Sequence, residues 1–180
     1  MVIKMILIGL GSNLTTDEFA TSKEILEAAM DMLAQRGVEI LKRSAFYETE
    51  PVPKSDQPWF CNAVVSVETK MGAIDLLKLL HDIEHDLGRV RRKRWEARII
   101  DLDLLSYNDE IFPSRDEWES EAQNINPEHA IIPHGRLHER DFVLIPMMDI
   151  CPDWQHPVLG KTTEKMLAGQ QSAGIVRKML

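Results

Sequence analysis

A basic segment that runs straight into an acidic pair carries the strongest chemical signal in the sequence. Residues 89–98 read Arg-Val-Arg-Arg-Lys-Arg-Trp-Glu-Ala-Arg, and six cationic side chains less Glu96 give the segment a local charge of +5. The whole chain has a formal net charge of −8. Because like charges gathered in so short a segment repel one another, a bound anion would stabilise it. The alternative is a solvated loop without a ligand.

Asp101 and Asp103 follow this segment within the sequence Ile-Ile-Asp-Leu-Asp-Leu-Leu. Side chains alternate along a strand, so both carboxylates project from one face, about 7 Å apart, and the neighbouring apolar side chains take the other face. Oxygen ligands without nearby thiolates favour Mg²⁺, which takes one or two carboxylates and fills its octahedron with water and phosphate oxygens. Arginines that grip phosphates beside such carboxylates predict phosphoryl transfer from a nucleoside triphosphate. The alternative is the exposed polar face of a half-buried strand.

Two further groups of residues carry weaker signals. Gly9-Leu-Gly11-Ser-Asn lacks the lysine and the spacing of a Walker loop, so it predicts only a tight strand-to-helix turn that a ligand could approach. His134 and His138 have the i, i+4 spacing of a zinc pair, but the flanking proline and glycine disfavour a regular helix there. Phosphate contact by His134 and Arg140 fits the remaining chemistry better.

Composition limits the classes of protein to which the chain can belong. With 180 residues, 44% of them hydrophobic and 28% charged, it has the makeup of one globular domain over 1–180. The acidic balance argues against a protein that coats nucleic acid, and no apolar run approaches the ~20 residues that span a bilayer. Cys61 and Cys151 provide no disulfide framework, so we expect small buried thiols and a reducing, cytoplasmic location.

Hydrophobic periodicity predicts the element order β-α-β-β-α-β. Strands are expected over 2–9, 38–47, 61–69 and 99–107, and helices after a capping box of Thr15 with Glu18, over 74–87 and over 162–167. This order is typical of an α+β domain whose antiparallel sheet carries its helices on one face. Residues 142–150 form a mixed apolar segment, and Phe60 and Phe142 are expected in the core unless a flat ligand needs a stacking partner.

Residues 108–128 turn polar and acidic and include Asp-Glu-Trp-Glu-Ser-Glu. Such a composition is typical of a surface excursion between elements. We expect an acidic insertion that is solvated and has no chemical role.

Together these motifs resemble the 6-hydroxymethyl-7,8-dihydropterin pyrophosphokinase family over about residues 5 to 160. The ordered motifs that carry the likeness are Gly9-Leu-Gly11-Ser-Asn-Leu, Tyr47-Glu-Thr49-Glu-Pro51-Val52, Asp56-Gln-Pro-Trp-Phe60-Cys-Asn62-Ala-Val, Ile83-Glu84-His-Asp-Leu-Gly88-Arg89-Val-Arg91, Arg94-Trp95-Glu-Ala-Arg98-Ile-Ile-Asp101-Leu-Asp103 and Pro133-His134 through Arg140-Asp-Phe142-Val-Leu-Ile-Pro146. The resemblance implies a ferredoxin-like βαββαβ core in a three-layer α-β-α arrangement. It also implies an enzyme that transfers pyrophosphate from ATP to the pterin hydroxymethyl group in folate biosynthesis and releases AMP.

The resemblance implies roles for the matching positions as well. Asp101 and Asp103 would hold two Mg²⁺ ions and would be catalytic together with Arg89 and Arg98. ATP contacts are expected from Glu84, Arg89, Arg91, Arg94, Arg98, His134 and Arg140. Pterin contacts are expected from Gly11, Thr49, Pro51, Val52, Phe60, Asn62, Trp95 and Phe142, with the two phenylalanines stacking on the ring. The family form is a monomer, and neither nucleic acid nor a membrane is an expected partner.

Three departures from the family pattern affect loops. Trp95-Glu-Ala-Arg98 stands where Trp-Gly-Pro-Arg is commonest, which changes the hinge stiffness of the lid that residues 89–98 would form. Gly135 stands where proline is usual, which we expect to loosen that turn, and the insertion over 108–128 is longer than expected. None of these changes removes a carboxylate or a phosphate-gripping arginine.

Two other functions stay open on the residues alone. One is a single-strand RNA-binding module that uses the basic segment with Trp95 as a stacking platform, against which the adjacent carboxylates argue. The other is a metal-dependent nucleotidyl or pyrophosphate transferase that acts on another flat heterocyclic alcohol.

Overall fold

The computed structural model of the chain describes residues 3–88, 99–124, 129–171 and 174–180. The elements in chain order are β1 (Ile6–Ser12), α1 (Ser22–Gln35), β2 (Val38–Arg43), β3 (Tyr47–Thr49), β4 (Phe60–Thr69), α2 (Ala73–Asp86), β5 (Asp101–Tyr107), α3 (Arg115–Glu121), the 3₁₀ turn η1 (Leu137–Glu139), α4 (Asp141–Ile150), α5 (Thr163–Ala168) and β6 (Val176–Lys178).

The six strands form one antiparallel sheet in the order β5-β1-β4-β3-β6, and β2 also pairs with β4. The long β4 makes this branching possible, because β2 pairs with residues 65–69 and β3 with residues 60–62. Without β3 and β6 the order is β5-β1-β4-β2, with α1 and α2 as the two crossover helices. The predicted ferredoxin-like βαββαβ core is confirmed.

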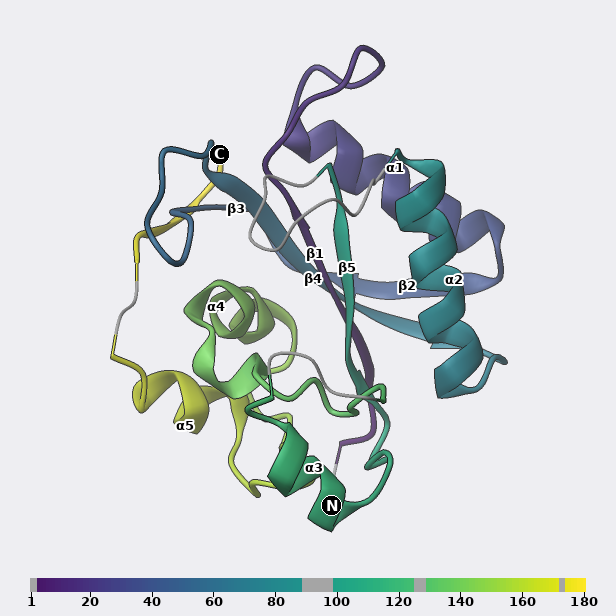
Figure 1. Cartoon of the computed structure of the whole chain (residues 1–180), viewed down its shortest axis with the longest axis vertical. Helices are drawn as coiled ribbons and strands as arrows, with labels where there is room; N and C mark the ends of the chain where they lie inside the picture. The colour runs from purple at the N-terminus through teal and green to yellow at the C-terminus, as the bar shows by residue number, and fades with distance from the viewer. Residues whose placement is uncertain (1–2, 89–98, 125–128, 172–173) are drawn as a thin grey trace.

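Helices cover both faces of the sheet: α1 and α2 lie on one side, and α4 and α5 lie on the other (Figure 1). The three-layer arrangement implied by the resemblance is therefore confirmed. The expectation drawn from element order alone, with all helices on one face, is wrong. It missed α4, whose apolar residues do not keep to one side of the helix and therefore gave no helical period.

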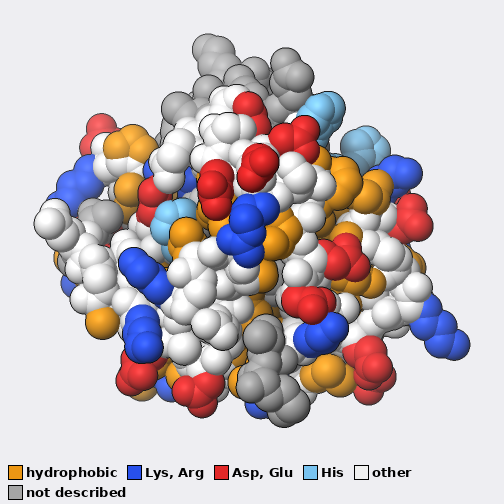
Figure 2. All heavy atoms as spheres, turned by 90° about the horizontal axis from the view of Figure 1, so that it is seen from below, with side chains coloured by type: hydrophobic (Ala, Val, Ile, Leu, Met, Phe, Trp, Pro, Cys, Tyr) orange, Lys and Arg blue, Asp and Glu red, His pale blue; other side chains and the backbone are white. Residues whose placement is uncertain are grey.

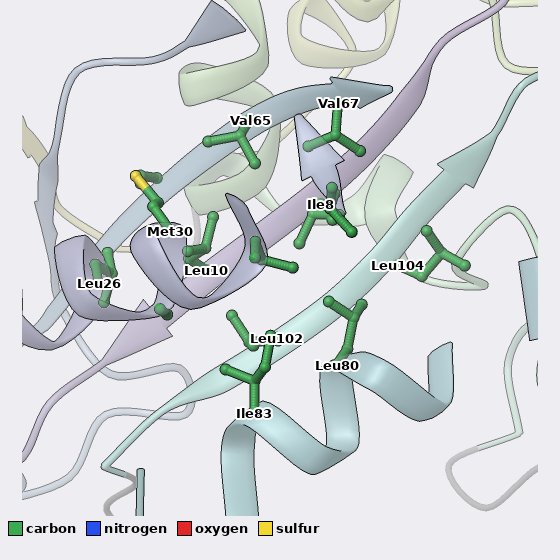
Figure 3. Packing of buried hydrophobic residues seen from close by; sticks show 14 of the residues in the cluster. Ile8, Leu10, Leu26, Met30, Val65, Val67, Leu80, Ile83, Leu102 and Leu104 are labelled. Carbon is green, nitrogen blue, oxygen red and sulfur yellow. The ribbon is translucent and has the colours of Figure 1, made fainter. Parts of the chain in front are cut away.

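Alternation along the strands builds a separate apolar core on each face. On the α1–α2 face, Leu26 and Met30 of α1 and Leu80 and Ile83 of α2 pack against the side chains of Ile8, Leu10, Val65, Val67, Leu102 and Leu104 (Figure 3). On the opposite face, Leu7, Val64 and Leu105 pack against α4 and Trp154. Both faces of the sheet are therefore largely occupied by core packing.

The start of the chain differs from the sequence prediction in two respects. The first strand runs to Ser12, so the two glycines lie inside β1 and form no turn. The capping box is made by Thr21 and Glu24: the Thr21 hydroxyl accepts from the Glu24 N–H at 3.2 Å, and the Glu24 carboxylate accepts from the Thr21 N–H at 2.9 Å. The predicted box around Thr15 is wrong because residues 13–20 form an irregular loop before α1.

The acidic insertion is structured over its described residues, 108–124. It contains α3, begun by Ser114, whose hydroxyl accepts from the Glu117 N–H at 3.3 Å. Trp118 of α3 is only 3% exposed, so a wholly solvated insertion is wrong. The face of the molecule seen from below Figure 1, on the side of α3, carries acidic side chains among lysines and arginines (Figure 2).

Candidate active site

The acidic pair lies on the face of the sheet that carries α4. Asp101 and Asp103 are half-buried, whereas Leu102 and Leu104 are buried in the core on the α1–α2 face. The predicted projection of both carboxylates from one face is confirmed. Across the sheet they pair with the glycines of β1, Asp101 with Gly11 and Asp103 with Gly9, so no side chain of β1 stands beside them. The two glycines therefore leave space beside the carboxylates on the β1 side.

A cavity of about 200 Å³ opens in front of these carboxylates. Segments far apart in the sequence meet in it: the two glycines of β1, the loop after β3, the start of β4, the acidic pair of β5 and the start of α4. Of the expected site residues that the structure describes, those lining the cavity are Gly11, Thr49, Pro51, Val52, Phe60, Asn62, Asp101, Asp103, Arg140 and Phe142. Tertiary structure therefore brings the candidate heterocycle-binding residues and the acidic pair into one cavity.

Asn62 and Thr49 form a buried polar wall of this cavity. The Asn62 amide nitrogen donates to the Thr49 hydroxyl at 2.6 Å, which fixes the side-chain carbonyl on the side of Gly11. A Cβ atom at Gly11 would lie 2.7 Å from this carbonyl oxygen, so only glycine leaves room for the amide. The arrangement presents a hydrogen-bond acceptor at the wall of the cavity.

Two aromatic rings border the same space. Phe60 begins β4 and Phe142 lies in the first turn of α4, and both keep part of their surface exposed. The Arg140 guanidinium lies 5.7 Å from the centre of the Phe142 ring, and its Nη1 lies 3.7 Å from Oδ2 of Asp103. Arg140 therefore links the aromatic part of the cavity to the acidic pair.

The loop after β3 forms part of the cavity wall, and Pro51 and Val52 line it. Sequence reasoning missed Glu50, Pro53 and Gln57, which also line it. The high proline content of the segment between Thr49 and Phe60 was the available signal, because proline-rich loops keep a fixed backbone and can shape a pocket.

Glu84, expected near the nucleotide, is not among the residues that line the cavity. Its side chain lies beneath β5, is 2% exposed and accepts a hydrogen bond from the Leu102 N–H at 2.8 Å. Leu102 stands between the two aspartates on a strand at the end of the sheet, so Glu84 fixes the backbone that carries them. Its contact with ATP stays a prediction.

His134 lies close to the acidic pair without lining the cavity. Burial lowers the pKa of its imidazole, and the Asp103 carboxylate opposes this effect. Its Nδ1 accepts from the Arg136 N–H at 3.2 Å, so the proton of the neutral ring is on Nε2. His134 and His138 do not share one face of an α-helix, because His138 lies in the 3₁₀ turn η1, where it packs beside Trp118. Within the described ranges no three His, Cys, Asp or Glu residues gather as a metal site.

The remaining expected site residues are Arg89, Arg91, Arg94, Trp95 and Arg98, and they lie outside the described residues. The expectations for a lid, for its altered hinge and for an RNA-binding platform fall on the same segment.

Comparison with known proteins agrees with this geometry. Residues 7–152 match the family model described as 7,8-dihydro-6-hydroxymethylpterin-pyrophosphokinase. A 2-amino-4-hydroxy-6-hydroxymethyldihydropteridine pyrophosphokinase from Methylorubrum extorquens is 36% identical over 171 residues, which cover 94% of this chain and 96% of that protein. The chain belongs to this family. A Bacillus subtilis pyrophosphokinase of the same name is 36% identical over 88% of this chain and 84% of its own length.

As a member of the pyrophosphokinase family, the protein transfers pyrophosphate from ATP to the hydroxymethyl group of 6-hydroxymethyl-7,8-dihydropterin, a step of folate synthesis. Loss of a pyrophosphoryl group converts ATP to AMP. Among solved structures, wild-type HPPK-DHPS of Plasmodium falciparum with pteroate matches with a TM-score of 0.69 at 16% identity. The match covers 92% of this chain and 44% of that longer one, and it supports the fold alone. None of the helices in the described ranges has the length and apolarity to cross a membrane.

Proposed function

We propose that the cavity between β1, β4, β5 and α4 is where pyrophosphate is transferred. The observation that carries this proposal is that one cavity is lined by two aromatic rings and a buried amide together with an acidic pair and an arginine. The aromatic rings and the amide suit a pterin ring, and the acidic pair with bound Mg²⁺ and the arginine suits the polyphosphate of ATP. The hydroxymethyl group of the pterin would lie between them.

The pterin ring lies between Phe60 and Phe142, where stacking on two faces suits a flat heterocycle. The Asn62 carbonyl accepts from an N–H of the ring, while the hydrogen bond to Thr49 keeps the amide from rotating. Gly11 and the backbone of Pro51 and Val52 approach the ring edge. This wall supplies both shape and polarity, and it aims the hydroxymethyl group at β5.

Asp101 and Asp103 are the residues that would hold Mg²⁺. Two carboxylates on one face, without a third acidic or histidine ligand among the described residues, fit Mg²⁺ that arrives with phosphate oxygens and water better than a site built from protein alone. Two ions are expected on the family pattern, and when bound they would neutralise phosphate charge and lower the pKa of the attacking alcohol. Arg140 and neutral His134 then donate hydrogen bonds to the phosphates.

Positioning and electrostatics supply most of the catalysis, because the reaction is an in-line attack by the hydroxymethyl oxygen on the β-phosphorus of ATP. Arg89 and Arg98 grip the phosphates with help from Arg91 and Arg94, Glu84 lies near the nucleotide, and Trp95 covers the pterin.

The protein acts as a monomeric, single-domain enzyme of the cytoplasm and binds neither nucleic acid nor membrane.

The test is incubation of the protein with ATP, Mg²⁺ and 6-hydroxymethyl-7,8-dihydropterin, with AMP and the pterin diphosphate quantified together. We expect the two products in equal amounts, and neither when the pterin is omitted or when EDTA removes the metal. ADP as the product, or AMP formed at the same rate without pterin, would contradict the proposal.

A further inference from the structure

The loop that carries His134 and Arg140 is held in place by the acidic insertion. Trp118 of α3 is buried, and its indole N–H donates to the Pro133 carbonyl at 2.7 Å. This is a buried hydrogen bond to the residue directly before His134. Leaving a buried carbonyl without its hydrogen-bond donor costs more folding free energy than losing a hydrogen bond at the surface.

The residue directly after His134 also touches the end of α3. A Cβ atom at Gly135 would lie 2.7 Å from the Ala122 carbonyl oxygen and 2.9 Å from the Ala122 Cα. Gly135 is therefore a packing requirement, since any side chain would push the insertion and the loop apart. The expectation of a loosened turn at this position stays a prediction, and the close approach gives a separate reason for glycine there. His134 is fixed on both sides by contacts with one element.

The same insertion reaches the loop further along. The Gln123 amide donates to the Glu139 carboxylate at 2.7 Å, and Glu139 pairs with Arg136 at 3.4 Å. Glu139 directly precedes Arg140, whose guanidinium approaches Asp103. Before α3, Phe112 and Ile132 form a two-way backbone bridge at 2.8 and 3.1 Å. The described part of the insertion thus contacts the 132–140 loop at both ends and in the middle.

We propose that α3 is a positioning element for the polyphosphate end of the active site, and that Trp118 of α3 and Gly135 of the loop are the positioning residues of this contact. Neither residue touches substrate. They act by fixing the backbone from which the His134 imidazole and the Arg140 guanidinium reach the ATP phosphates, so this inference rests on the function proposed above. Most of the pterin wall comes from β1, β3 and β4, whereas Phe142 follows Arg140 at the start of α4. We therefore expect the pterin end of the cavity to depend on the insertion less than the polyphosphate end does.

The test is steady-state kinetics of the full-length Trp118→Phe variant. Phenylalanine keeps an aromatic ring at the buried position, although it is smaller than the indole, and it removes the N–H that donates to Pro133, so we expect the KM for ATP to rise about five- to tenfold. The KM for the pterin should stay within about twofold of the parent value, because loss of one buried hydrogen bond is a local effect. Glu119→Ala is the matched control on the exposed side of α3 and should change neither constant.

Two further variants keep the test informative if Trp118→Phe folds poorly. Gly135→Ala introduces the close contact with Ala122, and Gln123→Ala removes an exposed hydrogen bond without disturbing the core. Both should raise the KM for ATP selectively. A lower melting temperature with both KM values unchanged, or an equal rise in both, would overturn the inference. An inactive parent enzyme would instead contradict the proposed function, so the two failures can be told apart.

Discussion

Two carboxylates carry the proposed chemistry at the scale of single residues. Asp101 and Asp103 face the cavity because strand alternation puts Leu102 and Leu104 into the core on the other side. Gly9 and Gly11 keep the neighbouring strand bare beside them. The side chain of Glu84 holds the strand backbone from below at Leu102. Side-chain alternation along β5 thus directs both carboxylates to the cavity face, and the glycines of β1 leave space beside them.

Replacement of either aspartate should therefore cost activity without loss of the fold. Asp101→Asn keeps the size of the side chain and removes its charge, so it should slow turnover about 10²- to 10⁴-fold at saturating Mg²⁺. We expect the same of Asp103→Asn. Turnover measured with a matched thermal melt checks this, and near-parental rates in either variant would refute the metal assignment.

At the scale of elements, the C-terminal strand supports the loop that closes the pterin end of the cavity. β6 pairs with β3, and the Ile175 carbonyl accepts from the Glu50 N–H at 3.0 Å where this loop begins. At the other end of the pair, the Met179 N–H donates to the Phe46 carbonyl at 2.9 Å. Hydrogen-bonded pairs alternate along an antiparallel ladder, so Arg177 and Glu48 are also such a pair, whereas Val176 and Thr49 are not.

This alternation yields a prediction with its own control. Arg177→Pro removes an N–H that belongs to the ladder, so Thr49 and the loop after it should loosen and the KM for the pterin should rise about threefold or more. Val176→Pro places proline where the N–H points away from β3, and it should leave this constant unchanged. Arg177→Ala is a second control, because it keeps the backbone N–H of the ladder and removes only the guanidinium, which lies 5.1 Å from the centre of the Trp59 ring. Equal constants for the two proline variants would contradict the prediction.

At the scale of the whole molecule, three buried or half-buried histidines make the fold sensitive to acid. Burial lowers the pKa of His134, His138 and His156, the last to about 3. His156 is completely buried among the rings of Trp118, Trp154 and His138, and the charges that face it are those of His138 and Arg115. Its Nδ1 accepts from the N–H groups of Val158 and Leu159, both at 3.2 Å, and its Nε2 has no partner among the described residues.

The direction of the pH effect follows from these pKa values. An unfolded histidine takes up a proton below about pH 6.5, whereas folded His156 stays neutral until about pH 3, so the free energy of unfolding falls as the pH falls through this range. At pH 5 the loss from His156 alone is about 2 kcal/mol. Urea unfolding at pH 7.5 and pH 5 measures it. His156→Asn keeps an acceptor for the two N–H groups and should flatten the dependence, while an unchanged slope would contradict this account.

The sequence by itself determined the βαββαβ order, the face on which Asp101 and Asp103 project, and the set of residues that the family pattern assigns to the pterin. These depend on local periodicity and on motif spacing, which one chain segment contains in full. It placed the first capping box six residues too early, at Thr15 instead of Thr21, because two Thr-x-x-Glu patterns satisfy the same local rule and the choice between them depends on where α1 packs Ile25 and Leu26 into the core.

Tertiary structure decided the rest. Only the folded sheet shows that the loop after β3 and the start of α4 close one cavity over the acidic pair, since contacts between distant segments leave no local period. The same holds for the insertion, whose acidic composition indicates a solvated segment although one buried tryptophan ties it to the loop before α4. Whether the Trp118 ring is buried and whether a Cβ at Gly135 would fit both depend on a surface formed by residues elsewhere in the sequence. No local pattern encodes that surface.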